Sequence, residues 1–142
     1  MSHTYYLAMA RTLETTLEIT GWDEQSYEDI EGGAKCTRAE VTLKPGPDGL
    51  GPATSQSLMY YRPDGTSSLV SLMRVSGTID GRSGSFVLLG QGSYDATTAL
   101  VESVVVEGSG TGELAGISGT AVSRSTKDDY PDMPLTLVYD IE

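Results

Sequence analysis

The segment SSLVSLMRVSGTIDGRSGSFVLLGQGSY, residues 67–94, decides the fold that we predict for this chain. Its two halves, residues 67–79 and 85–94, are rich in apolar residues whose spacing is typical of strands. Between them, DGRSG at residues 80–84 supplies the Asp-Gly pair that a tight turn prefers. We therefore expect residues 67–94 to form an antiparallel hairpin.

Segments with the same pattern recur along the rest of the chain. In residues 11–20, Leu13, Leu17 and Ile19 share one face with Thr15 between them, and Glu14, Thr16 and Glu18 share the other. Short runs of this kind, separated by turn residues, are typical of all-β domains. The expected strands span residues 11–20, 36–44, 53–62, 67–79, 85–94, 97–108, 119–125 and 135–141.

The connections between these segments are short and rich in glycine and proline, which favours turns. Residues 21–35, GWDEQSYEDIEGGAK, are expected to form an acidic loop with one helical turn at most. The glycine-dense residues 108–119 are expected to hold a short turn of helix around Glu113 to Ala115. Together the pattern predicts an all-β, eight-stranded, antiparallel up-and-down β-barrel. Residues 1–142 would form this single domain, with residues 1–10 as an N-terminal arm.

The composition narrows the choice of partner and location. The chain has 142 residues and a formal net charge of −11, which disfavours binding to nucleic acid or to an anionic membrane. Cys36 is the single cysteine, so an intrachain disulfide cannot form. The start of the chain lacks the pattern of a signal peptide, and we expect a cytoplasmic protein.

Several expected strands carry apolar residues on both faces. In residues 67–79, Leu69, Met73 and Val75 alternate with Val70 and Leu72. The outside of an isolated barrel should be polar, so a partner is expected to cover part of it. We predict a homodimer.

Several longer motifs resemble one bacterial family. These are GTIDGRSGSFVL at residues 77–88, GSGTGELAGISG at residues 108–119, and GWDEQSYED with GGAKCTRAEVT near the start. They are similar to the family catalogued as domain of unknown function 3224, and the likeness spans nearly the whole chain. The resemblance implies an allene oxide cyclase-like barrel, a fold whose namesake enzymes cyclise an unstable epoxide in a hydrophobic cavity.

The chain departs from that family at two positions. Met73 stands where members often carry a glutamate, and Gly90 stands where they tend to carry a histidine. If those residues form the family's site, the resemblance implies that this chain has a roomier and more apolar cavity, suited to a specialised substrate or to binding alone.

Metal and nucleophile chemistry is disfavoured by the residue counts. His3 and Cys36 are the single histidine and cysteine, too few for a zinc site or a histidine-dependent triad. The run GSGTGELAG lacks the Gly-Lys-Ser/Thr ending of a phosphate loop. We expect no metal and no cofactor, and a barrel interior that holds a hydrophobic small molecule.

Polar residues set among apolar ones are the candidates for the site. The preferred hypothesis is a cofactor-free cyclase or isomerase that acts on a hydrophobic unsaturated molecule, for example in natural-product biosynthesis. Its candidate catalytic residues are Glu40, Tyr61, Arg74 and Glu102. As ligand-binding residues we name Trp22, Arg38, Gln56, Met59, Tyr60 and Met73. The alternatives are a lipocalin-like binding protein without turnover and a structural oligomer with a filled core. Each named residue also has a plain structural reading, such as surface pairing of Arg38 with Glu40.

Overall fold

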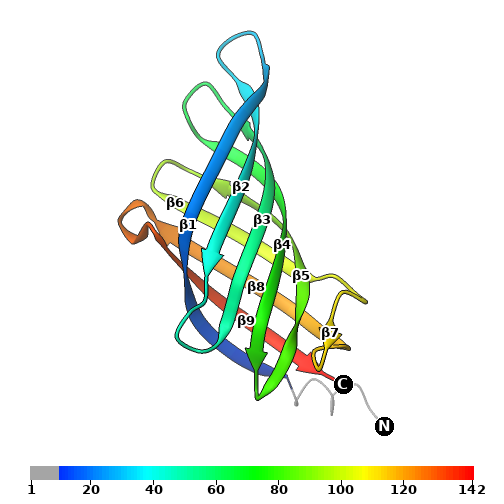
Figure 1. The fold of residues 1–142 in the computed structure, drawn as a ribbon. Helices are drawn as coiled ribbons and strands as arrows, with labels where there is room; N and C mark the ends of the chain where they lie inside the picture. Colours follow the sequence, from blue (N-terminus) through cyan, green and yellow to red (C-terminus); the bar gives the residue numbers. More distant parts are fainter. Residues whose placement is uncertain (1–9) are drawn as a thin grey trace.

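A computed structural model describes residues 10–142, and Figure 1 shows their arrangement. The strands are β1 (Arg11–Asp29), β2 (Lys35–Lys44), β3 (Leu50–Tyr61), β4 (Ser67–Ile79), β5 (Arg82–Tyr94), β6 (Thr98–Val105), β7 (Thr111–Gly112), β8 (Ile117–Thr126) and β9 (Asp132–Ile141). A short 3-10 helix, η1 (Lys127–Asp129), precedes β9. The all-β class is confirmed, while the predicted arm lies outside the described residues except for residue 10. No helix in the described part of the chain has the length and hydropathy to cross a membrane.

The strands form one antiparallel sheet of nine strands, and eight of them are hydrogen-bonded in a ring. The order runs β4-β3-β2-β1-β9-β8-β6-β5, and pairing of β4 with β5 closes it. Most neighbours in the ring are also neighbours in the chain, which confirms the expected succession of hairpins. The ninth strand, β7, pairs only with the start of β5.

The hairpin predicted from residues 67–94 forms as expected between β4 and β5. Ile79 pairs with Arg82, so the turn consists of Asp80 and Gly81 alone. Both residues have positive φ, 53° and 75°, a conformation that aspartate and glycine tolerate better than most residues.

The prediction of a loop over residues 21–35 was wrong for residues 21–29 and right for residues 30–34, which form the turn between β1 and β2. β1 continues to Asp29 and pairs with β2 as far as the contact between Asp29 and Lys35. Residues 21–29 lack a buried apolar face, which is why their pattern suggested a loop. Pairing with the regular strand β2 holds them extended, with register shifts near Gly21 and Tyr27.

The expected helical turn at Glu113 to Ala115 is also absent, because residues 111–116 form β7 and a turn. Thr111 packs directly against Gly84, where a Cβ atom would lie 2.0 Å from the Thr111 carbonyl oxygen. Glycine at position 84 therefore permits β7 to close over β5. The Thr111 hydroxyl also accepts a hydrogen bond from the Ser85 backbone.

The interior of the ring is packed at one end. Phe86, Leu17, Leu50, Leu114 and Leu137 are its largest fully buried side chains. The inward faces predicted for residues 11–20, 36–44 and 135–141 are confirmed by the burial pattern of β1, β2 and β9.

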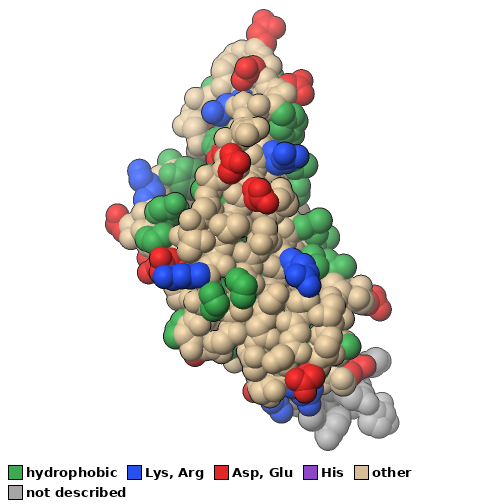
Figure 2. Space-filling view, in the orientation of Figure 1, with side chains coloured by type: hydrophobic (Ala, Val, Ile, Leu, Met, Phe, Trp, Pro, Cys, Tyr) green, Lys and Arg blue, Asp and Glu red, His purple; other side chains and the backbone are tan. Residues whose placement is uncertain are grey.

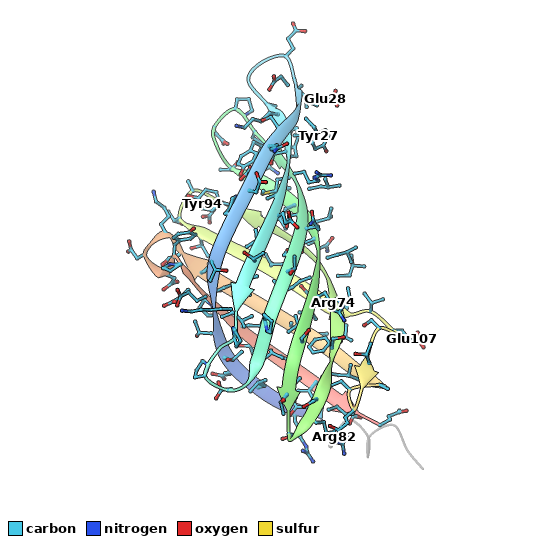
Figure 3. The ribbon with its side chains drawn as sticks, viewed as in Figure 1. Tyr27, Glu28, Arg74, Arg82, Tyr94 and Glu107 are labelled. Carbon is cyan, nitrogen blue, oxygen red and sulfur yellow. The ribbon has the colours of Figure 1, made fainter. Side chains whose placement is uncertain are left out.

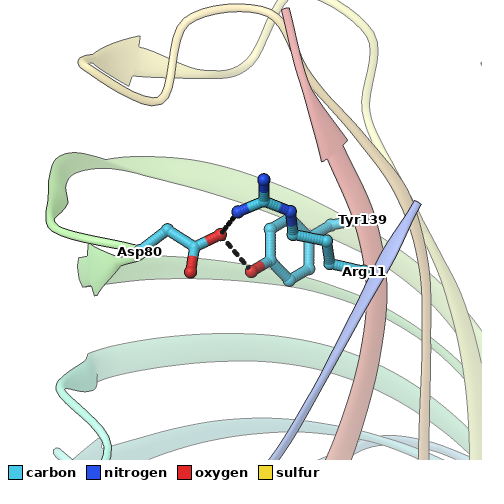
Figure 4. A network of polar contacts seen from close by, with 3 residues as sticks. All are labelled: Arg11, Asp80 and Tyr139. Atoms are coloured by element: carbon cyan, nitrogen blue, oxygen red, sulfur yellow. Dashed lines mark hydrogen bonds and ion pairs between the residues drawn. The ribbon is translucent and has the colours of Figure 1, made fainter. Parts of the chain in front are cut away.

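A polar network spans the ring at this packed end (Figure 4). The carboxylate of Asp80 accepts hydrogen bonds from Arg11 Nη1 at 2.6 Å and from the Tyr139 hydroxyl at 2.8 Å. The two donors lower the pKa of Asp80, and burial and the contact with Asp80 raise the pKa of Tyr139. The network ties the β4–β5 turn to β1 and β9.

Candidate functional site: an open cavity inside the ring

The other end of the interior contains a cavity of about 150 Å³. Every strand of the ring contributes at least one residue to its lining, so the cavity lies at the centre of the ring. Its lining residues, all within the described chain, are apolar or serine, and none of them is charged. The serines are Ser55, Ser57, Ser71, Ser103, Ser123 and Ser125.

These serine hydroxyls face the cavity. Serines that bond to other side chains of the described residues, such as Ser68 and Ser85, lie elsewhere, and none of the six lining serines takes part in such a bond. Ser55 and Ser123 are buried and the other four are half-buried, so their hydroxyls are available to a molecule inside the cavity.

A wider mouth of about 520 Å³ opens from the cavity. The two spaces share lining residues, Ala99 and Met59 among them, and therefore adjoin each other. Four aromatic side chains surround the mouth: Trp22, Tyr61, Tyr94 and Tyr130. Figure 3 shows Tyr94 toward the end of the molecule that carries the β1–β2 hairpin, with Arg82 at the opposite end.

Glu24 holds two of these aromatic residues in place. Its carboxylate accepts hydrogen bonds from Trp22 Nε1 at 2.9 Å, from the Thr37 hydroxyl at 2.8 Å and from the Tyr61 hydroxyl at 2.8 Å. The ammonium of Lys35 lies 5.3 Å from the centre of the Tyr61 ring. Glu24 does not line the cavity or the mouth, so its role is to position Trp22 and Tyr61.

The same contacts set the protonation states of Glu24 and Tyr61. Burial raises the pKa of Glu24, but the three donors and the Lys35 charge outweigh burial, and the pKa lies below its ordinary value. Burial, followed by the hydrogen bond and charge of Glu24, raises the pKa of Tyr61 to about 12. Near neutral pH Glu24 is thus ionised and Tyr61 is neutral.

Acidification is expected to change the fluorescence of Trp22, the single tryptophan, when Glu24 takes up a proton. The ionised carboxylate stabilises the folded mouth above the ordinary glutamate pKa of 4.5, and this contribution is lost as the pH falls through the depressed pKa. The midpoint of the fluorescence change should therefore lie below pH 4.5. Glu24→Gln should lack this transition, and its presence in that variant would contradict the assignment.

The structure places the candidate residues on both sides of the sheet. Four of them face the cavity or its mouth: Trp22, Met59, Tyr61 and Met73. The others have exposed side chains on the outer side: Arg38, Glu40, Gln56, Tyr60, Arg74 and Glu102. Of the four residues named as catalytic, only Tyr61 is therefore near the cavity.

Sequence reasoning missed Glu24, Thr37 and the lining serines. Glu24 was hidden in the segment interpreted as a loop. The serines did leave a signal, because Ser55 and Ser57 are two residues apart on the buried face of one strand, as are Ser123 and Ser125. Both positions at which the chain departs from the family pattern also point inward, with Met73 lining the cavity and Gly90 buried between Ser71 and Ser103.

Fold and cavity together define a class: a small all-β protein in which a ring of antiparallel strands encloses an open, uncharged cavity. Among residues 10–142, no group of three or more histidine, cysteine or acidic side chains is placed to hold a metal ion.

The chain belongs to the DUF3224 family, described as proteins of unknown function, whose sequence profile matches residues 13–137. Its fold is similar to the crystal structure of a protein of unknown function from the DUF3224 family of Shewanella oneidensis MR-1. That likeness has a TM-score of 0.68 and 24% sequence identity, and covers 93% of this chain and 99% of the other. No curated protein matches this chain.

Proposed function

We propose that this protein binds one small, neutral, mainly apolar molecule inside the ring, with hydroxyl or carbonyl groups on the ligand meeting the serines. The observation that carries this proposal is the lining of the cavity, which combines apolar side chains with six serine hydroxyls and contains no charge. A charged ligand would lose its hydration there without gaining an ionic partner. A neutral ligand with a few polar groups matches both kinds of lining residue.

The size of the space limits the ligand. An apolar cavity of about 150 Å³ is sufficient for a molecule the size of benzene. A larger ligand would extend into the mouth, where Trp22 and the three tyrosines offer flat apolar surfaces and where Lys127 and Asp132 also line the space. Ligand sites commonly measure about 300–1,000 Å³, a range that the mouth reaches and the inner cavity does not.

Trp22 at the mouth provides a direct test. Titration with 2-naphthol, a neutral aromatic alcohol, should change Trp22 fluorescence saturably, with one molecule bound per chain. Naphthalene-2-sulfonate and 2-naphthylmethylammonium have the same ring system but carry a charge, and each should bind about 10-fold more weakly or worse. Equal binding of the three, or no saturable binding of 2-naphthol, would contradict the proposal.

Cofactor-free cyclisation or isomerisation of an unsaturated molecule is the second candidate function. It is favoured by the Tyr61 hydroxyl at the mouth, which donates its proton to Glu24 and could stabilise a developing oxyanion by turning from Glu24 to the substrate. Glu24 is a weak base because three donors and a lowered pKa keep it ionised. Glu40, Arg74 and Glu102 lie on the outer face, so catalysis would depend mainly on orientation of the substrate.

We also propose that the ring is an up-and-down barrel of the allene oxide cyclase-like type. The closed order of eight strands supports this proposal, and so does the cavity at its centre. A cytoplasmic location remains part of the proposal, since the chain's single cysteine allows no intrachain disulfide.

A further inference from the structure

Five large apolar side chains on the outside of the ring are each 48–52% exposed. They form the outer apolar patch: Leu58, Val70, Leu72, Leu89 and Val104. Figure 2 shows hydrophobic side chains along the side of the molecule where β4 and β5 lie. Large exposed apolar patches with polar surroundings typically mark interaction sites.

The patch is continuous across four strands. Leu58 of β3 pairs directly with Val70 of β4, and Leu72 of β4 pairs with Leu89 of β5. Leu89 pairs in turn with Val104 of β6. Directly paired side chains on one face of a sheet touch or nearly touch, so these residues form one surface.

Arg38 and Glu40 of β2 lie beside the patch at one end, and Glu102 of β6 lies beside it at the other. A groove of about 440 Å³ on one side contains Arg38 next to Leu58 and Leu72. A groove of about 700 Å³ on the other side contains Glu102 next to Val104. One row of paired residues joins two of these charges, running Arg38, Leu58, Val70, Gln91, Glu102.

This distribution of charge fits a second copy of the chain. A two-fold axis lying along β4 sets Val70 and Leu72 against the same residues of the other copy, and it brings Arg74, the next outward residue of β4, near Arg74 of that copy. The same rotation places β2 of one copy opposite β6 of the other. The groove with Arg38 on each copy therefore faces the groove with Glu102 on the other copy, which gives two such contacts per dimer. Each copy carries a net charge of −11 and repels the other in general, whereas this face offers both apolar contact and paired charges.

We propose that the outer apolar patch is a two-fold interface between two copies of this chain. The apolar side chains form its centre, and Arg38, Gln91 and Glu102 form its polar rim. A stable interface of ordinary size covers about 800 Å² on each partner. The interface is separate from the cavity, so the proposal is independent of the ligand.

Sedimentation equilibrium of the full chain at micromolar concentration tests this proposal. The natural chain should have twice the mass of one copy. Leu72→Glu places two carboxylates face to face on the two-fold axis and should raise the dimer dissociation constant about 100-fold or more. Val138→Glu is the matched control, because Val138 is also an exposed apolar residue on the outer face but lies on β9, and it should leave the dimer intact.

Exchange of the two charges tests the two-fold arrangement itself. Arg38→Glu and Glu102→Arg should each weaken the dimer, because each sets like charges together, and the double variant should restore it. A circular-dichroism spectrum equal to that of the natural chain checks that each variant is folded. A monomeric natural chain would overturn the proposal, as would equal effects at residues 72 and 138 or a double variant no tighter than the single ones.

Discussion

Ala99→Phe is expected to weaken the binding of 2-naphthol about 10-fold or more. Ala99 lines both the inner cavity and the mouth, so a phenyl ring at this position occupies the passage between them. A ligand could then enter only by displacing that ring, and crowding of a packed site costs about 1–3 kcal/mol, or about 5- to 150-fold in affinity. Fluorescence titration of Trp22 measures the change.

Ser118→Phe is the matched control for this variant. It introduces the same ring at an exposed position on the outer side of β8, away from the mouth. Its affinity for 2-naphthol should equal that of the natural chain. If Ala99→Phe, still folded by circular dichroism, binds as tightly as this control, the ligand does not pass through the mouth.

Phe86→Ala should lower the free energy of unfolding by about 3–5 kcal/mol. Phe86 is 0% exposed and is the largest fully buried side chain of the packed end of the interior. Its removal leaves a hole among side chains that belong to eight paired strands and cannot easily close around it. Most domains are stable by only about 5–15 kcal/mol, so the variant should unfold at a much lower urea concentration.

Val138→Ala provides the comparison for Phe86→Ala. Val138 is 40% exposed on β9, and its truncation should cost about 1 kcal/mol or less. Urea unfolding of both variants at one protein concentration, followed by circular dichroism, gives the two values. Similar losses for Phe86 and Val138 would show that the packed end contributes no more than the surface does.

Most of the fold could be predicted from the sequence because the strands alternate clearly. Ala39, Val41 and Leu43 share one face in residues 36–44, and all three are buried. Residues 21–29 could not be assigned in this way. They have no apolar face of their own, and their extended conformation depends on pairing with β2, a contact between segments that local pattern does not contain.

The candidate site was harder to predict than the strands. The pattern in residues 36–44 already places Arg38 and Glu40 opposite the buried face, so their outward direction could have been inferred. The direction of the side chains in residues 67–79 could not be inferred in this way. Leu72 and Val70 are as apolar as Leu69 and Met73, so the pattern did not show which face was the inner one. Trp22 and Tyr61 were named individually, but Glu24, which joins them, became visible only once β1 was seen to continue past Gly21.

The central claim is that the cavity inside the ring admits a small neutral ligand, and the methionines offer the most direct measurement. Met59, Met73 and Met133 all line the cavity, and none lies in the outer apolar patch. In a sample with 13C-labelled methionine methyl groups, addition of 2-naphthol should shift the NMR signals of these three residues, each assigned by substitution with leucine. Saturable binding of 2-naphthol at Trp22 without any shift at Met59, Met73 or Met133 would contradict the claim.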